Sequence, residues 1–185
     1  MFIDRAKEPA DLETERLILR NWHLTDATAL YQICRDEELR RSGVGYFESV
    51  RDAGNTIGLW AKEDCFKAII HRETGELIGF VCLGDMNRYK GYMELEYAIA
   101  ADHRNRGYAT EALRRMVDYG FSEFDLEVIA AWVRSHNTGS ARVLEKCGFK
   151  LEGRLRKHAR DRSDTLCYSI LREEWENTVK YRGRD

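Results

Sequence analysis

The spacing of apolar and polar residues predicts a chain built from strands and helices. In residues 16–20 the two kinds alternate as they do in a half-buried strand. Further on, two apolar runs flank a turn at 73–76 and predict a β-hairpin. A second turn, at 87–91, leads into the next strand. The predicted strands cover residues 16–20, 67–71, 77–83, 92–100, 127–133, 149–156 and 164–171.

Helical periodicity is strongest over residues 108–124, where apolar and small side chains recur on one face. Shorter helices are predicted at about 26–35, 50–63 and 140–147, and Gly148 is expected at the C-terminal end of the last. This order of elements predicts an α/β fold. Its sheet is mixed and mostly antiparallel, with one parallel crossover and flanking helices.

Composition bounds the size and the surroundings of the protein. Its 185 residues fit one domain and contain no proline- or glycine-rich linker, so we predict a single domain over 1–185. A formal net charge of −2 gives no basic field for DNA. The chain has no apolar run of roughly 20 residues for a membrane span, and no signal peptide is recognisable at its start. We therefore expect a cytoplasmic protein without a membrane partner.

Cysteines and histidines give no sign of a metal. The five cysteines are scattered without a CxxC pair, and the five histidines show no ligand spacing. We predict no metal cofactor and interpret the cysteines as reduced core residues, with a nucleophilic thiol as the rarer alternative.

The loop at residues 102–111 has the features of an anion cradle. It joins a strand to an amphipathic helix, whose start offers unpaired N–H groups and a partial positive charge. Gly107 lets the backbone approach a ligand, Ala109 is small, and Arg104 and Arg106 add positive charge. Taken alone, the segment is equally compatible with a plain solvated loop. It is neither a Walker loop nor a GxGxxG fingerprint.

A second segment, at 137–149, begins with Asn137 between a strand end and a helix. Asparagine at such a place is expected to cap the helix or, alternatively, to bind an amide-rich ligand arm. The two segments become specific when they are taken together, in this order along the chain.

Both segments resemble motifs of the GNAT superfamily of N-acetyltransferases. The run Arg104-x-x-Gly107-x-Ala109 resembles the motif that binds the pyrophosphate of acetyl-CoA, and Asn137-x-x-Ser140 with Gly148-Phe149 resembles the motif that lines its pantetheine arm. The opening Thr14–Arg20 and the closing Tyr168–Trp175 look like the branch of ribosomal-protein N-terminal acetyltransferases (RimJ/RimL-like). The resemblance spans about residues 12–176.

The resemblance implies acetyl-CoA as co-substrate, wedged in a sheet splayed between its fourth and fifth strands, here about 92–100 and 127–133. The backbone N–H of Ala98 or Ile99, on a locally bulged strand, is expected from the resemblance to stabilise the oxyanion. Many members protonate the leaving thiolate with a tyrosine whose position here is Leu144, so Ser140 is the expected substitute. The residues expected at the acetyl-CoA site are Ala98, Ile99, Arg104, Asn105, Arg106, Gly107, Tyr108, Ala109, Thr110, Asn137 and Ser140.

A carboxylate base is expected because an amine must be neutral to attack a thioester. Alternation sends Glu94 and Glu96 to one face of the strand at 92–100, and either can accept the proton directly or through water. Cross-strand pairing or solvent exposure is the alternative role for each.

The predicted acceptor is the α-amino group of a protein or peptide. Its ordinary pKa of about 7.7–8.0 leaves more neutral amine than a lysine pKa of about 10.4, so it needs less help from a base. Side chains expected to wall a cleft for such a peptide are Arg40, Arg41, Tyr46, Phe47 and Trp60.

Three other readings stay open on the sequence. The acceptor could be a small amine such as a polyamine or an aminoglycoside. The protein could instead sense acyl-CoA without catalysis. The basic run at 154–162 could contact RNA or an acidic substrate, although a solvated loop is its simpler interpretation. A homodimer is possible, and the acyl-chain preference is open.

Overall fold

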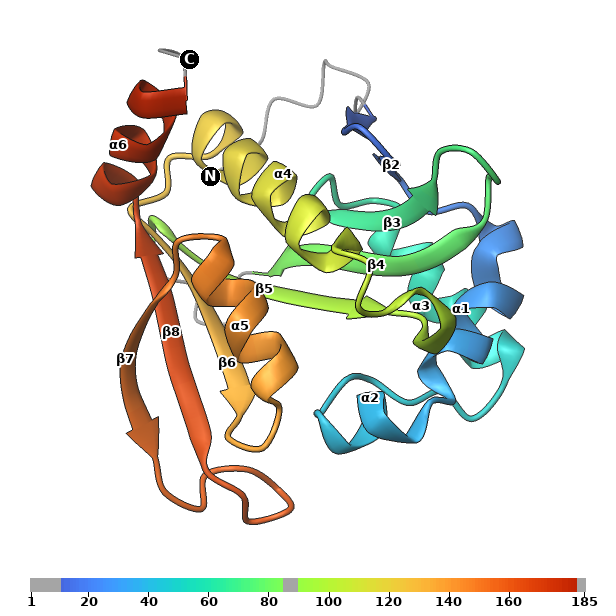
Figure 1. Cartoon of the computed structure of the whole chain (residues 1–185). Coiled ribbons are helices and arrows are strands. Elements are labelled where there is room, and N and C mark those ends of the chain that lie inside the picture. Colours follow the sequence, from blue (N-terminus) through green and yellow to red (C-terminus); the bar gives the residue numbers. More distant parts are fainter. Residues whose placement is uncertain (1–10, 85–89, 183–185) are drawn as a thin grey trace.

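Eight strands form one sheet in the computed structural model, which describes residues 11–84 and 90–182 (Figure 1). Their order across the sheet is β1-β2-β3-β4-β5-β6-β8-β7, and of these neighbours only β5 and β6 run parallel. The strands are β1 (Leu12–Glu13), β2 (Leu17–Arg20), β3 (Phe66–His71), β4 (Leu77–Gly84), β5 (Tyr92–Ile99), β6 (Val128–Arg134), β7 (Lys150–Leu155) and β8 (Thr165–Leu171).

Helices cover both faces of the sheet (Figure 1). On one face lie α4 (Tyr108–Glu123), which is the crossover between the parallel strands, and α5 (Thr138–Lys146). On the other face lie α1 (Ala27–Cys34) and α3 (Val50–Trp60). None of the described helices is long and apolar enough to cross a membrane. The shorter or peripheral elements are η1 (Leu24–Asp26), α2 (Glu37–Arg41), η2 (Ala101–His103) and α6 (Arg172–Arg182).

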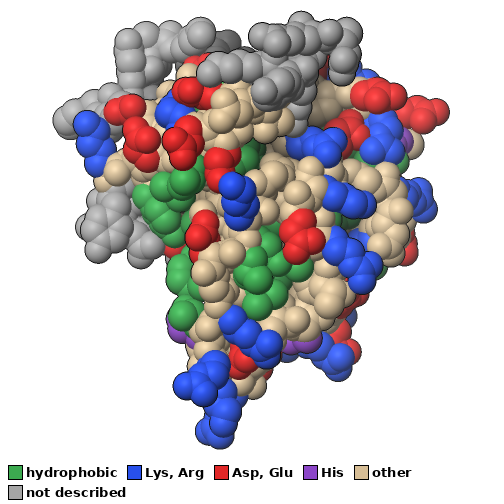
Figure 2. Space-filling model, turned by 60° about the vertical axis from the view of Figure 1, so that its left-hand side comes forward, with side chains coloured by type: hydrophobic (Ala, Val, Ile, Leu, Met, Phe, Trp, Pro, Cys, Tyr) green, Lys and Arg blue, Asp and Glu red, His purple; other side chains and the backbone are tan. Residues whose placement is uncertain are grey.

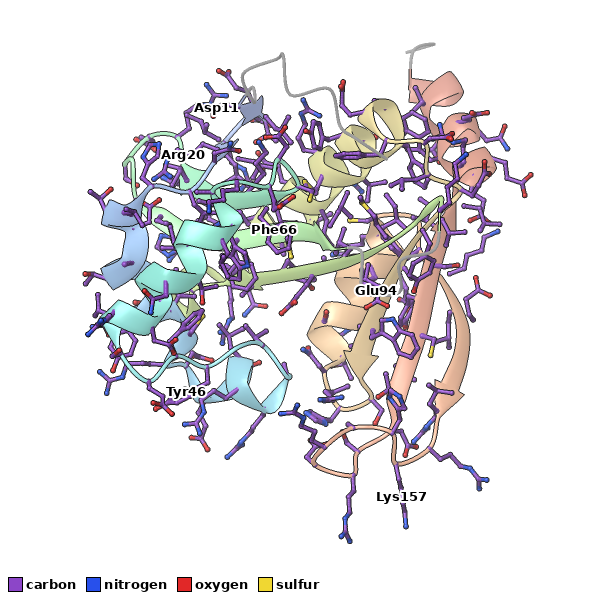
Figure 3. The ribbon with its side chains drawn as sticks, turned by 180° about the vertical axis from the view of Figure 1, so that it is seen from behind. Asp11, Arg20, Tyr46, Phe66, Glu94 and Lys157 are labelled. Atoms are coloured by element: carbon purple, nitrogen blue, oxygen red, sulfur yellow. The ribbon has the colours of Figure 1, made fainter. Side chains whose placement is uncertain are left out.

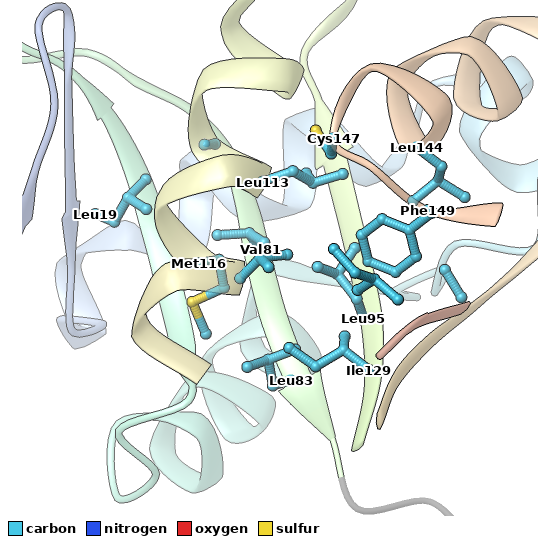
Figure 4. Packing of buried hydrophobic residues seen from close by; sticks show 14 of the residues in the cluster. Leu19, Val81, Leu83, Leu95, Leu113, Met116, Ile129, Leu144, Cys147 and Phe149 are labelled. Atoms are coloured by element: carbon cyan, nitrogen blue, oxygen red, sulfur yellow. The ribbon is translucent and has the colours of Figure 1, made fainter. Parts of the chain in front are cut away.

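The larger apolar core lies between the sheet and α4. Leu113 and Met116 are fully buried there against Val81 and Ile129 of the strands (Figure 4). Gly120 permits close packing of α4, because a Cβ at this position would lie 2.7 Å from a methyl carbon of a neighbouring leucine. A second core on the opposite face joins α1 and α3 to the sheet. The position of α4 is therefore fixed by burial of its apolar stripe.

The parallel strands pair at one end only. Tyr92–Glu94 of β5 lie opposite Val128–Ala130 of β6. Beyond this point β5 stays with β4 as far as Ile99, whereas β6 stays with β8 as far as Arg134. The sheet therefore opens into a V. This confirms the splay predicted between the fourth and fifth strands, which become β5 and β6 because the two-residue β1 precedes them.

Most predicted elements are present within a few residues of their expected ends. Gly148 adopts a left-handed φ of 91° directly after α5, as predicted for a helix C-terminus. The helix predicted to reach residue 63 ends at Trp60. The turn predicted at 87–91 falls mainly on residues 85–89, which lie outside the described ranges. The sequence analysis did not predict β1, α2 or α6.

Candidate active site

A cleft of about 410 Å³ occupies the open end of the gap between β5 and β6. Its walls come from the end of β5, the following loop, α2 and the first turns of α4 and α5. Arg106 is exposed and does not line it. The predicted acetyl-CoA residues that do line it are Ala98, Ile99, Arg104, Asn105, Gly107, Tyr108, Ala109, Thr110, Asn137 and Ser140. Their location supports the predicted roles in binding, which remain predictions.

The backbone curls at the start of α4. Asn105 and Gly107 both adopt left-handed conformations, with φ of 60° and 84°. Glycine has no side chain that could cap the helix or block a ligand, so the N–H groups of the first turn remain available to an anion. Since α4 has 16 residues, its dipole also favours negative charge at this end.

The N-terminal segment holds this cradle from behind, a contact that the sequence analysis did not predict. Glu111 in the first turn of α4 accepts hydrogen bonds from Thr14 Oγ1 (2.7 Å) and from the backbone N and Nε of Arg16 (both 2.8 Å). Burial opposes ionisation, yet these bonds and the charge of Arg16 outweigh it and lower the pKa of the Glu111 carboxyl. Arg16 also donates to the carbonyl of Arg106 (3.0 Å) and stacks on Tyr108.

Arg104 borders the cleft, but its guanidinium is already paired. Its Nε donates to the carbonyl of Ile99 (3.0 Å), and its two terminal nitrogens donate to Glu38 (2.8 Å) and Asp36 (3.0 Å). Asp36 also caps α2 by accepting from the backbone N of Leu39 (2.8 Å). For Arg104 to supply charge to phosphates, as predicted, it would have to exchange these partners.

A second contact ties α2 to the opposite arm of the V. Asn137 caps α5 by accepting from the backbone N of Ser140 (3.0 Å), which is one of its two predicted roles. Its Nδ2 donates to Ser42 Oγ (3.0 Å), at the end of α2. Residues 36–42, here named the α2 bridge, thus connect Arg104 after β5 with Asn137 after β6.

Two hydroxyl groups meet inside the cleft. Tyr97 Oη of β5 and Ser140 Oγ of α5 lie 2.9 Å apart, and either can donate. Burial raises the pKa of Tyr97 to about 12. One turn along α5, Leu144 is fully buried in the core, so no polar group occupies the place where the resemblance expects a tyrosine (Figure 4). Ser140 was predicted from the sequence, whereas Tyr97 was not.

The two candidate bases project from the other face of β5, and neither lines the cleft, contrary to our expectation. The Glu96 side chain is exposed as a whole, while its carboxyl end is crowded by protein atoms. Burial, and after it the charge of Glu96, raises the pKa of the Cys34 thiol of α1 to about 12. Loss of hydration, followed by the charge of Glu94, raises the pKa of Glu96. Glu94 accepts from Tyr92 Oη (3.3 Å) and is seen beside β6 from behind (Figure 3).

The expected bulge near Ala98 is absent. The β4–β5 pairing keeps a regular register from Glu94 to Ile99. The backbone N of Ala100 donates to the carbonyl of Ile78 on β4 (2.8 Å). Antiparallel alternation therefore turns the N–H of Ala98 toward β4 and that of Ile99 toward the open gap. Of the two predicted oxyanion donors, only Ile99 directs its N–H to the cleft side.

Two residues predicted to wall a peptide cleft belong to the core instead. Phe47 is buried, and Trp60 packs against Trp22, with ring centroids 5.4 Å apart. The large apolar area of these rings favours burial more strongly than contact with a transient ligand. The other members of the set remain exposed: Arg40, Arg41 and Tyr46.

The basic run at 154–162 spans the end of β7 and the loop before β8. Lys157 projects from the lower tip of the molecule (Figure 3), and Lys and Arg side chains gather at this tip on the face shown in Figure 2. Arg154 is paired with Asp164 (2.6 Å), and His158 stacks on the half-exposed Trp132 (centroids 5.6 Å apart). A binding role for this loop remains a prediction.

Comparisons with known proteins agree with this geometry. Residues 16–150 match the GNAT acetyltransferase domain. The chain is 35% identical to the uncharacterized N-acetyltransferase YoaA of Bacillus subtilis, over 87% of this chain and 96% of that protein. It is 32% identical to the uncharacterized N-acetyltransferase p20 of Bacillus licheniformis, over 89% and 97%.

Solved structures share the fold. A GNAT-family acetyltransferase from Bacillus anthracis superposes with a TM-score of 0.79 at 27% identity, over 89% of this chain and 99% of that one. Spermidine N-acetyltransferase from Vibrio cholerae, in complex with CoA and spermine, gives 0.77 at 21%, over 88% and 99%. Ribosomal-protein-S5-alanine acetyltransferase from Vibrio fischeri gives 0.76 at 19%, over 90% and 98%.

The chain therefore belongs to the GNAT acetyltransferases and is an N-acetyltransferase. Enzymes of this family use acetyl-CoA, and the cleft suits such a ligand. A helix N-terminus without a capping side chain lies at one end, and the unpaired edges of β5 and β6 flank the gap. Within residues 11–84 and 90–182, no three His, Cys, Asp or Glu side chains are grouped to hold a metal ion.

Proposed function

We propose that the protein transfers the acetyl group of acetyl-CoA directly to the α-amino group of a peptide or protein N-terminus. The observation that carries the proposal is the arrangement of β5. This strand presents a ligand cleft on one face and a carboxylate with a raised pKa, Glu96, on the other. In this proposal the amine approaches a thioester in the cleft from the Glu96 side, where β5 and β6 are no longer paired.

The binding roles follow the walls of the cleft. The backbone around Gly107 and the first turn of α4 hold the pyrophosphate. Asn137 and the open edges of the strands hold the pantetheine arm. The N–H of Ile99 stabilises the negative oxygen of the tetrahedral intermediate, because it points into the gap.

Glu96 is the proposed base. A carboxylate with a raised pKa is a stronger base, and it holds the proton from the attacking amine more readily than an ordinary glutamate does. An α-amino group suits such a base, because much of it is already neutral near its pKa of about 7.7–8.0. Ribosomal-protein-S5-alanine acetyltransferase, which shares the fold, has a protein as its acceptor according to its name.

A polyamine is the second candidate acceptor. Glu94 and Glu96 lie on one face of β5, and their combined charge would attract a polycation. The spermidine enzyme that shares the fold points in the same direction. We propose a cytoplasmic location for either acceptor, and the buried free thiols of Cys34, Cys65 and Cys82 support it.

Mass spectrometry of a matched acceptor panel separates these cases. Lysine-free peptides with a free N-terminus would be compared with N-terminally blocked peptides that contain lysine, with spermidine and with an aminoglycoside. We expect acetylation of the free N-termini. Acetylation confined to spermidine or to lysine would overturn the acceptor assignment, and acetyl-CoA binding without turnover of any amine would overturn the proposed catalysis.

Glu96→Gln tests the base. We expect kcat to fall by roughly 10²–10⁴-fold near neutral pH, with a smaller loss at alkaline pH where the amine deprotonates by itself. The fold favours protonated Glu96, so ionisation above its raised pKa costs stability that the glutamine variant regains. Its Tm should exceed that of the wild type near neutral pH, and the difference should vanish below pH 4.5, the ordinary pKa of the group.

Glu94→Gln is the matched control, since it removes the neighbouring carboxylate from the same face of the strand. A variant Glu96→Gln with wild-type kcat from mildly acidic to alkaline pH would exclude Glu96, and a large loss in Glu94→Gln alone would transfer the role to Glu94.

A further inference from the structure

The place of the expected tyrosine acid is filled by Leu144, yet the cleft still contains a tyrosine. Tyr97 comes from β5, on the opposite wall, and its hydroxyl lies 2.9 Å from Ser140 Oγ. Both residues line the cleft, whereas Leu144 is completely buried behind it. The tyrosine hydroxyl therefore reaches the cleft from β5, whereas the resemblance predicts a tyrosine on α5.

We propose that Tyr97 positions Ser140 to stabilise the leaving thiolate, with Tyr97 Oη–H donating to Ser140 Oγ and Ser140 Oγ–H donating to the sulfur. This inference rests on the proposed function, since it concerns the same reaction. Ser140 is then the catalytic residue that touches the sulfur. Tyr97 acts through it as a positioning residue.

The direction of the hydrogen bonds follows from the number of protons. A serine hydroxyl has one proton and two lone pairs. If Tyr97 donates to Ser140, the proton of Ser140 stays free for the sulfur. Hydrogen bonds in sequence polarise one another, so the serine becomes a better donor than it would be alone. The substitution Tyr97→Phe would remove the donor that fixes the direction of the Ser140 hydroxyl, while keeping the aromatic ring.

The pair stabilises the thiolate without protonating it. The pKa of Tyr97 is raised to about 12, well above that of a thiol at about 8.5, so transfer of its proton to sulfur is uphill. The amine nitrogen bonds to the acetyl carbon, the carbon–sulfur bond breaks, and its electron pair goes to sulfur. The amine proton passes to Glu96 and then to water. The thiolate takes a proton from water when it leaves the site.

The decisive measurement is the pKa of the CoA thiol in its complex with the enzyme, followed by the ultraviolet absorbance of the thiolate. The same titration with desulfo-CoA supplies the background from the protein's own tyrosines and cysteines. We expect the bound thiol to have a lower pKa than free CoA. Tyr97→Phe and Ser140→Ala should each raise it by about one unit, since a hydrogen bond to a charged group is lost.

Tyr119→Phe is the matched control. Tyr119 of α4 is another tyrosine whose pKa is raised to about 12, but it packs against Phe124, directly after the helix, and does not line the cleft. This variant should leave the thiol pKa unchanged. In steady-state assays the two cleft variants should lose kcat by roughly 10-fold each with little change in KM, and the double variant should be no worse than Ser140→Ala.

The outcomes separate this inference from the proposed function. If CoA binds Tyr97→Phe and its thiol pKa equals that of the wild-type complex, the role of Tyr97 is wrong, whatever the acceptor is. If CoA fails to bind the wild-type protein, the proposed function fails before this question arises. Unchanged Tm values in both cleft variants would show that the effect does not come from unfolding.

Discussion

The cradle at the start of α4 and the α2 bridge border the same cleft but are built differently. The cradle is made by one continuous stretch, and its brace from Arg16 and Glu111 consists of several short hydrogen bonds. The bridge contains a five-residue helix, held by side chains that lie 66 to 95 positions away in the chain. The cradle is held by residues that do not line the cleft. The α2 bridge is held by Arg104 and Asn137, which are themselves predicted to bind the ligand.

The ion pairs that hold the cradle and the bridge also differ in their exposure to water. The Glu111 carboxylate is 17% exposed, so its bonds are protected from water. In the bridge, Glu38 is 74% exposed, and exposed ion pairs stabilise a protein by about 0–1 kcal/mol. The Asp36–Arg104 pair of the bridge is sheltered like the brace, with side chains 22% and 21% exposed. We therefore expect the exposed tie through Glu38 to be displaced by a ligand more easily than the brace at Glu111.

The largest effect is expected from Gly107→Asp. The left-handed φ of 84° strains any side chain, and a Cβ here would lie 3.3 Å from the Arg16 guanidinium of the brace. The added carboxylate would also bring negative charge to the proposed pyrophosphate site, a repulsion that costs several kcal/mol. Acetyl-CoA affinity should fall on the order of 100-fold or more, measured by calorimetry. Gly75→Asp is the control, because Gly75 has a similar φ of 70° in the hairpin turn. Normal thermal stabilisation of Gly107→Asp by acetyl-CoA would contradict the cradle.

A middle effect is expected from Glu111→Gln, which weakens the brace without touching the ligand. The charge-assisted bonds from Arg16 are lost, and the free energy of unfolding should fall by about 2 kcal/mol. Acetyl-CoA should bind more weakly because the cradle is less ordered. Glu123→Gln, at the other end of α4, should change neither quantity. If Glu111→Gln destabilises the fold and leaves affinity intact, the brace does not shape the cradle.

The smallest effect is expected from Ser42→Ala, which removes one tie of the bridge. One neutral hydrogen bond is worth about 1 kcal/mol or less, so Tm should change little. Acetyl-CoA affinity should rise up to a few-fold, because Asn137 no longer has to leave Ser42. A clear loss of affinity would show instead that the bridge is part of the assembled binding site.

The sequence predicts the strand, loop and helix around the cradle well because their signals are local. A strand, a glycine and an apolar helical stripe follow one another within residues 92–124, and each acts through neighbouring residues. The α2 bridge was missed because a five-residue helix with one buried side chain, Leu39, has no measurable periodicity. Signals for it were present nevertheless, since Asp36 suits an N-cap and acidic residues precede basic ones.

Long-range pairs account for the other omissions. Tyr97 and Ser140 are 43 residues apart, and Arg16 and Glu111 are 95 apart. No pattern along the chain reports that two such side chains meet, since their distance is set by how whole strands and helices pack. The same applies to Trp60, whose burial depends on the aromatic rings around it rather than on its neighbours in sequence.

The order of the strands bears on how the protein is made. Apart from an exchange of the last two, strands lie in the sheet in the order in which they emerge from the ribosome. Each new strand can therefore add to an edge that already exists, with little entropy lost in closing long loops. The first arm and its N-terminal brace can form before α5 is synthesised. The cleft exists only once the second arm has docked, so a nascent chain can gain most of its core before it gains a place for its ligand.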